Sequence, residues 1–265
     1  MIPQKSFVEL QKISSSLAAE CHALRFGPHV AAVYNPLEYA KGPHNLYLEL
    51  AGAAPKKVLF LGMNPGPWGM AQTGVPFGEI TAVRDWLGLE AAVDKPEKEH
   101  PKRPIEGFAC RRSEVSGRRL WGMFRENFGT PACFFRDHFV ANYCPLLFMD
   151  CGGTNITPDK LPAFETEALF NICDHALAQI IDILKPQWVI GIGGFAKKRI
   201  DMVHKQFYDG KEPGRGASNS STGFGFSTAQ ILHPSPANPR ANAGWKDEVL
   251  KTLYGLGVWK NNVEK

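Results

Sequence analysis

The chain has 265 residues, 44% of them apolar, and a formal net charge of +4. This length fits one α/β domain or two small ones, with ample apolar content for a core, and we expect a single domain over residues 1–265. No apolar run reaches the roughly 18 residues of a membrane span, and the N-terminus has no signal-peptide pattern. We therefore expect a soluble, intracellular protein.

Periodicity and turn residues predict strands that alternate with helices. Apolar runs of strand length lie at 58–63, 139–142, 188–192 and 228–232. A first helix is predicted from the capping-box pattern of Ser6 and Glu9, with Leu24 on its apolar stripe. Further helices are predicted at about 44–50, 80–89, 118–128, 164–184, 194–203 and 242–254, and a surface loop at 214–225. This alternation predicts an α/β fold with a mostly parallel sheet and helices on both sides.

The segment at about 94–117 is polar and contains three prolines, so we expect a long excursion from the domain rather than a linker. Eight basic residues and four acidic ones lie between Lys95 and Arg119. Such a local excess indicates a polyanionic partner, although a solvated loop without a partner also explains it.

Six cysteines are scattered along the chain without a C-x-x-C pair, which predicts neither a zinc ribbon nor a disulfide framework. We expect buried free thiols. They are Cys21, Cys110, Cys133, Cys144, Cys151 and Cys173.

Three polar residues, Asn64, Asn142 and His233, stand at the ends of apolar strand runs. Each one alone is explained as a cap or a buried histidine, but the carboxyl ends of parallel strands share one edge, so the three can converge. Neither carboxamide titrates near neutral pH, so neither can act as a general base. Together the three side chains can bind the edge of a planar heterocycle, hold a water and stabilise a leaving oxygen. With Phe77 as a stacking face, they predict a nucleobase site.

Two motifs, GMNPGPWGMAQTGVPFGE at 62–79 and HPSPANP at 233–239, strongly resemble those of the single-strand-selective monofunctional uracil-DNA glycosylases. The segment NYCPL at 142–146 resembles the sequence between them, and the resemblance extends through Trp245. It implies a three-layer α/β/α uracil-DNA glycosylase fold with a central four-stranded parallel sheet. It also implies no metal and no cofactor, and the scattered cysteines argue against the iron–sulfur cluster of some relatives.

The same resemblance implies roles for individual residues. Asn64 would position the attacking water, and His233 would donate to O2 of the departing uracil anion. Asn142 would bind the Watson–Crick edge of the flipped base, and Phe77 would stack on its ring.

The backbone around Met63 and Gly66 would line the pocket. Gly66 stands where classical uracil-DNA glycosylases carry a tyrosine that blocks a 5-methyl group. The resemblance therefore implies activity on 5-hydroxymethyluracil and other oxidised uracils besides uracil, with thymine excluded by other means.

The second motif implies DNA contacts by Ser235, Pro236, Asn238 and Arg240. Vertebrate-type members carry an arginine wedge between the second proline and the asparagine, where this chain has Ala237. We expect Arg240 to replace that wedge in part.

The sequence also bears on three other functions. The run Gly191-Ile192-Gly193-Gly194 imitates a dinucleotide fingerprint, but its third glycine is misplaced and no acidic residue closes the next strand about 20 residues on, so no nucleotide cofactor is expected. A non-catalytic damaged-DNA-binding module of the same fold is the main alternative. Lyase chemistry would need a lysine nucleophile, which no motif offers. We therefore expect a monomeric, monofunctional glycosylase that excises uracil and modified uracil from single- and double-stranded DNA and initiates base excision repair.

Overall fold

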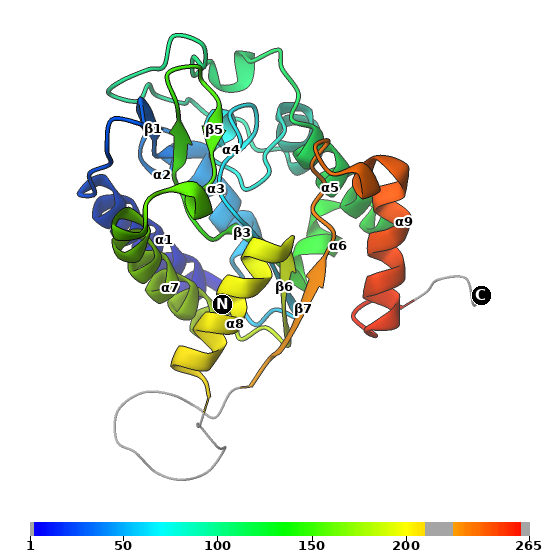
Figure 1. Cartoon of the computed structure of the whole chain (residues 1–265). Helices are drawn as coiled ribbons and strands as arrows, with labels where there is room; N and C mark the ends of the chain where they lie inside the picture. Colours follow the sequence, from blue (N-terminus) through cyan, green and yellow to red (C-terminus); the bar gives the residue numbers. More distant parts are fainter. Residues whose placement is uncertain (1–2, 210–224, 261–265) are drawn as a thin grey trace.

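The computed structural model describes residues 3–209 and 225–260 (Figure 1). Its centre is a parallel sheet of four strands in the order β3-β2-β6-β7. The strands are β2 (Val58–Gly62), β3 (His138–Asn142), β6 (Trp188–Ile192) and β7 (Ser227–Ile231). The four apolar runs of the sequence form these strands, which confirms the predicted α/β fold and its four-stranded parallel sheet.

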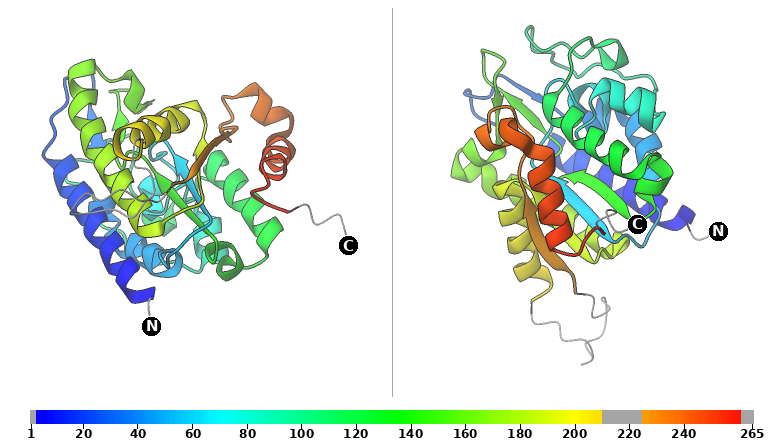
Figure 2. Two further views of the ribbon diagram at one scale, coloured as in Figure 1. Left: turned by 90° about the horizontal axis from the view of Figure 1, so that it is seen from below. Right: turned by 90° about the vertical axis from the view of Figure 1, so that its right-hand side faces the viewer.

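Helices cover both faces of this sheet. All five residues of β2 are buried, as expected for a central parallel strand. Figure 2 shows α1, α7 and α8 on one side and α5 and α9 on the other. The α-helices are α1 (Pro3–His22), α2 (Pro36–Tyr39), α3 (Lys41–Ala51), α4 (Met70–Thr73), α5 (Val115–Phe128), α6 (Pro131–Phe135), α7 (Ala163–Leu184), α8 (Gly194–Phe207) and α9 (Pro239–Gly255).

Two predicted helices differ in detail from the structure. Helix α1 begins at Pro3, so Ser6 lies inside it and the predicted capping box is wrong, while Leu24 lies beyond its last residue. The predicted helix at 80–89 is mainly a π-helix, η1 (Ala82–Leu87). It ends at Gly88, whose φ of 70° is a left-handed conformation that glycine adopts readily.

A second sheet was not expected from the sequence. Its antiparallel strands are β1 (Ala32–Tyr34), β4 (Leu147–Met149) and β5 (Asn155–Ile156), in the order β1-β4-β5. Strands of two or three residues are too short to show a periodic pattern. This sheet brings the chain after β3 back toward the carboxyl edge of the parallel sheet.

The polar excursion has no helix or strand between η1 and η2 (Gly107–Ala109), a short 3₁₀ helix. Buried Gln72 ties it to the Gly/Pro loop after β2. Its Nε2 donates to the carbonyls of Pro67 and Pro104, both at 3.0 Å. Its Oε1 accepts from the backbone N–H groups of Glu106 and Gly107. The excursion is therefore packed beside that loop.

Cationic side chains of the excursion also reach this loop. The guanidinium groups of Arg103 and Arg112 lie 5.2 Å and 4.6 Å from the ring centroid of Trp68. Such cation–π contacts are favourable because the electrostatic potential over the faces of the indole ring is negative.

All six cysteines are free thiols. Four are buried as predicted, but Cys133 and Cys151 are exposed, so the prediction is wrong for those two. A cluster of three or more metal-ligating side chains is absent from the described residues. Within the same residues, no helix is long and apolar enough to cross a membrane. The predicted loop at 214–225 lies almost wholly outside the described residues. A further short 3₁₀ helix, η3 (Pro158–Lys160), precedes α7.

Candidate active site

A cavity of about 360 Å³ lies at the carboxyl edge of the parallel sheet, and its volume is typical of small-ligand sites. The three polar residues at strand ends, Asn64, Asn142 and His233, all line it. The full lining is Met63, Asn64, Gly66, Pro67, Phe77, Glu114, Ser116, Asn142, Asn155, Thr157, His233 and Ser235. Residues more than 160 positions apart in the sequence thus meet in one site.

The carboxamide of Asn64 is oriented by the chain that follows β3. Its Nδ2 donates to the carbonyl of Leu146 at 3.2 Å and lies 3.5 Å from Oδ1 of Asn155. The backbone N–H of Cys144 donates to the carbonyl of Met63, which keeps the two strand ends side by side. Because the amide nitrogen is used by the protein, Oδ1 is the atom left to accept from a water or a substrate.

The imidazole of His233 is held as one neutral tautomer. The backbone N–H of Ser235 donates to Nδ1 at 3.1 Å, so Nδ1 is an acceptor and the proton resides on Nε2. Burial lowers the pKa of His233 from 6.5 to about 4. At neutral pH the ring is therefore an uncharged Nε2–H donor.

Gly193 lets the chain pass close to this histidine. Its φ is 92°, and a Cβ there would lie 3.1 Å from Cβ of His233. The glycines that imitate a dinucleotide fingerprint thus have a packing role beside the site.

Phe77 adopts a strained conformation at the cavity. Its φ of 54° is rare for a bulky side chain, and such strain is often found at functional sites. A Cβ on Gly62 would lie 2.4 Å from the Phe77 ring, and one on Gly117 would lie 2.1 Å from the Phe77 carbonyl oxygen. Trp121 Nε1 donates to the carbonyl of Pro76 at 3.2 Å. The missing side chain at Gly62 thus leaves room for the ring at the end of β2, and the missing side chain at Gly117 leaves room for the Phe77 backbone.

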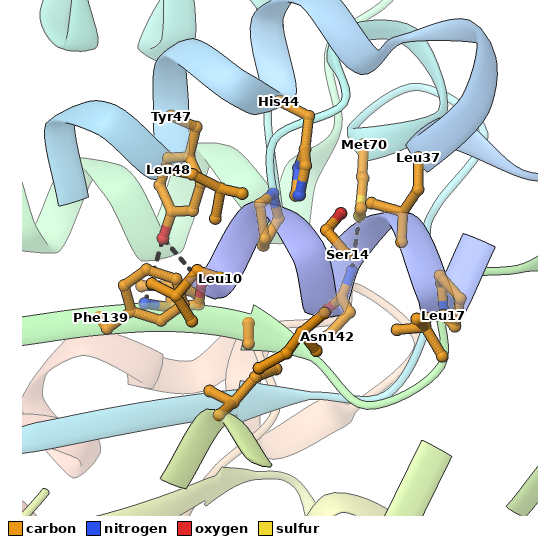
Figure 3. A pocket seen from close by; sticks show the side chains of 16 residues that line it. Leu10, Ser14, Leu17, Leu37, His44, Tyr47, Leu48, Met70, Phe139 and Asn142 are labelled. Carbon is orange, nitrogen blue, oxygen red and sulfur yellow. Dashed lines mark hydrogen bonds between the residues drawn. The ribbon is translucent and has the colours of Figure 1, made fainter. Parts of the chain in front are cut away.

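Asn142 stands between two cavities. Figure 3 shows it at a small apolar cavity of about 60 Å³ behind the site, where its Nδ2 donates to Sδ of Met70 at 3.2 Å. Its Oδ1 is buried and has no hydrogen-bond partner among the described residues. An unpaired buried acceptor costs about 1–3 kcal/mol, so this atom favours a ligand with an N–H donor.

An arginine without a predicted role in the site, Arg119, anchors the loop after His233. Nη1 of Arg119 donates to the carbonyl of Pro234 at 3.0 Å, and Nη2 donates to Oδ1 of Asn242 at 2.9 Å. Nδ2 of Asn242 in turn donates to the carbonyl of Pro236. In the sequence Arg119 belongs only to the local basic excess, but its guanidinium binds this loop.

The four predicted DNA-binding residues are divided by the structure. Ser235 lines the cavity, whereas Pro236, Asn238 and Arg240 lie outside its lining. Asn238 is the N-cap of α9, and its side chain accepts from the backbone N–H of Arg240. The guanidinium of Arg240 pairs with Glu248.

Five lining residues have no role predicted from the sequence, although the first of them lies in the motif at 62–79: Pro67, Glu114, Ser116, Asn155 and Thr157. Asn155 belongs to the unexpected β5, and Glu114 directly precedes α5. Burial, with a smaller effect of Glu79, raises the pKa of Glu114 from 4.5 to about 7. Contacts between loops and short elements bring these side chains to the cavity, and a periodic sequence pattern does not predict such contacts.

No lysine is among the described residues that line the cavity. Burial lowers the pKa of Lys56 to about 8, but this side chain donates to the carbonyl of Phe135. Lys56 also lies two residues before the start of β2, at the opposite end of that strand from Asn64.

The profile of the uracil DNA glycosylase superfamily matches residues 51–254. The chain is 46% identical to the single-strand selective monofunctional uracil-DNA glycosylase of Rattus norvegicus over 242 residues, which cover 91% of this chain and 82% of the relative. It is also 46% identical to that of Bos taurus over 239 residues, covering 90% and 82%.

The crystal structure of wild-type Pedobacter heparinus SMUG2 matches with a TM-score of 0.61 over 93% of this chain and 97% of that one. The identity is 15%, so this likeness concerns the fold alone. The sequence matches confirm the resemblance carried by the motifs: the chain belongs to the uracil DNA glycosylase superfamily and, within it, to the single-strand selective monofunctional uracil-DNA glycosylases.

Proposed function

We propose that this chain is a monofunctional uracil-DNA glycosylase that hydrolyses the N-glycosidic bond of uracil in DNA. The observation that carries the proposal is the neutral His233, with its proton on Nε2, in one cavity with Asn64, Phe77 and Asn142. These side chains supply a donor for a leaving oxygen, an acceptor for water, a stacking face and a base-reading amide.

Recognition begins when the uracil leaves the base stack, which costs a few kcal/mol and least in single strands or mismatches. The base then stacks on Phe77, whose position is fixed by Gly62 and Gly117. The unpaired Oδ1 of Asn142 accepts from N3–H of uracil. Cytosine has no hydrogen on N3 and would leave this acceptor unpaired, so the same contact discriminates against it.

The bond between N1 and C1′ breaks with its electron pair moving to the base, and the charge of the uracil anion is shared between N1 and O2. The Nε2–H of His233 donates to O2 and stabilises this charge. A water that donates to Oδ1 of Asn64 adds its oxygen to C1′ and releases a proton to solvent, and the uracil anion takes up a proton from solvent to give free uracil. The sugar is cation-like at this point, so a weakly activated water suffices.

The lining supports a single hydrolytic step. A lyase would need an amine that forms a Schiff base with C1′, and lysine is absent from the described lining. The products would be free uracil and an intact strand with an abasic sugar.

The proposal extends to 5-hydroxymethyluracil and other oxidised uracils, and to both single- and double-stranded DNA. Arg240 is proposed as a partial wedge in duplex DNA, and it would have to leave Glu248 to enter the duplex. Arg240→Ala should then slow excision from duplex more than from single strands. If Arg240→Ala excised uracil at the wild-type rate from both duplex and single-stranded DNA, Arg240 would not be a wedge.

The test of the activity uses a labelled oligonucleotide with one uracil, single-stranded and opposite guanine. A monofunctional glycosylase releases uracil and gives strand cleavage only after alkali. Cleavage without alkali would indicate a lyase. Binding of the oligonucleotide without release of uracil would indicate a non-catalytic DNA-binding module.

A further inference from the structure

Glu114 occupies the space beside Gly66 in the candidate active site. A Cβ on Gly66 would lie 1.8 Å from Oε1 of Glu114, and one on Gly69 would lie 2.2 Å from Oε2. The carboxyl group therefore fills the volume that a side chain at position 66 would take. Because Glu114 also lines the cavity, this wall is acidic.

This carboxyl group has no hydrogen-bond partner among the described residues, although the backbone carbonyl of Glu114 accepts from Arg118. Its charged neighbour is the buried Glu79, whose own Oε2 accepts from the backbone N–H of Ala82. With its pKa raised to about 7, the Glu114 carboxyl is present in both protonated and ionised forms near neutral pH. It can therefore both donate and accept a hydrogen bond.

The geometry of the pyrimidine ring determines what this wall meets, and this step rests on the proposed function. N1 carries the sugar, O2 faces His233, and N3–H faces Asn142. Continuing round the ring past O4, the edge of C5 and C6 would face the part of the lining that these contacts leave over, and Gly66, Pro67 and Glu114 belong to that part.

We propose that Glu114 is a specificity-determining residue that hydrogen bonds a polar substituent on C5, such as the hydroxyl of a 5-hydroxymethyl group. A hydroxyl can donate to the ionised carboxyl or accept from the protonated one, so it pairs in either state. The methyl group of thymine would shield the carboxyl from water without offering a partner, which is costly for a polar group. Glu114 thus both favours the hydroxymethyl base and disfavours thymine.

The test compares kcat/KM for single-stranded oligonucleotides that carry either uracil or 5-hydroxymethyluracil. Glu114→Ala removes the carboxyl, and Glu114→Met removes it while keeping the side-chain length. For both variants we expect the ratio of hydroxymethyluracil to uracil to fall about tenfold, as for loss of a hydrogen bond to a charged group. Glu114→Gln can still donate and accept and should show a smaller fall.

The matched control is Glu97→Ala, which removes an exposed carboxylate of the same excursion outside the cavity lining. Its ratio should equal that of wild type. A ratio within twofold of wild type in both Glu114→Ala and Glu114→Met would overturn the proposal. If either variant fails to fold, as judged by thermal unfolding, the other decides.

The two proposals fail in different ways. If the wild-type protein releases no uracil, the proposed function fails and the role of Glu114 fails with it. If the wild type releases both bases but the Glu114 variants keep its ratio, only the role of Glu114 is lost.

Discussion

The backbone N–H of Ser235 donates to Nδ1 of His233 at 3.1 Å, two residues back along the chain. This local contact determines the chemistry of the ring, because it leaves the single proton of the neutral imidazole on Nε2. Burial prevents ionisation, with a pKa of about 4. The leaving base therefore meets a neutral donor.

The first prediction concerns the state of this ring. NMR of the imidazole nitrogens should show the Nε2–H tautomer of His233 at pH 7 and a pKa near 4, well below the usual 6.5. In a pH titration from 8 to 5 the ring signals should stay almost unchanged, because a group with a pKa near 4 remains neutral over that range. Titration near 6.5, or a proton on Nδ1, would contradict the assignment.

Arg119 should act as a positioning residue. Arg119→Ala removes the hydrogen bonds to Pro234 and Asn242, so we expect kcat/KM for uracil to fall about tenfold, mostly through kcat. The tautomer and pKa of His233 should change together with the rate. A general loss of fold stability would not explain such a change in the ring. Arg125→Ala removes an exposed arginine of the same helix and is the control. Equal effects of the two variants would argue against positioning.

Gly66 and Glu114 should be energetically coupled. Gly66→Ala places a methyl 1.8 Å from Oε1 of Glu114, so the carboxyl must move, and we expect a loss of stability and of uracil excision. The double variant Gly66→Ala/Glu114→Ala should recover part of both, with a coupling of about 0.5–3 kcal/mol. Gly122→Ala, where a Cβ meets nothing within 4 Å, is the control for adding a methyl group. Additive effects in the cycle would mean that the two residues do not interact.

Acid should destabilise the fold through His44 and His138. Burial lowers both pKa values to about 4, so the unfolded chain binds more protons than the folded one between about pH 6.5 and 4. Their contribution is complete above pH 6.5 and is lost as the pH falls toward 4. Each ring should cost roughly 2 kcal/mol at pH 5.

For His138 the contact with Trp259 reinforces this, because Trp259 Nε1 donates to Nε2, which must then carry no proton. The hydrogen bond between Nδ1 and the carbonyl of Phe134 acts in the opposite direction and raises the pKa, but burial outweighs it. Urea unfolding at pH 7, 6 and 5 measures the effect. Glu114, whose pKa is raised to about 7, acts in the opposite direction over this range, so the same measurement is made on Glu114→Ala. A free energy of unfolding that stays constant from pH 7 to 5 in that variant would be inconsistent with buried neutral rings.

The strands of the parallel sheet and the residues at their ends could be predicted, because they depend on local sequence patterns. The continuous apolar run at 58–62 predicts a buried strand, and the proline after Asn64 predicts its end. The same logic applies to Asn142 and His233. A shared strand edge then brings them together without any knowledge of side-chain contacts.

Other parts of the site depend on contacts that no pattern encodes. Asn155 is brought to Asn64 by a two-residue strand, and Glu114 reaches Gly66 from a polar segment. Arg119 had the charge expected of a DNA contact, but its position on α5 turns it toward the loop after His233. For these residues the packing between loops decides the role.

The most direct test of the account is release of uracil from a single-stranded oligonucleotide by wild type, Asn64→Ala and His233→Ala, with DNA binding measured in parallel. We expect uracil release by wild type and a loss of about 10²–10³ in rate for His233→Ala, the range seen when one charge-stabilising donor is removed. Asn64→Ala should also be slower, and both variants should still bind DNA. Release at the wild-type rate by both variants would contradict the assignment of this cavity as the active site.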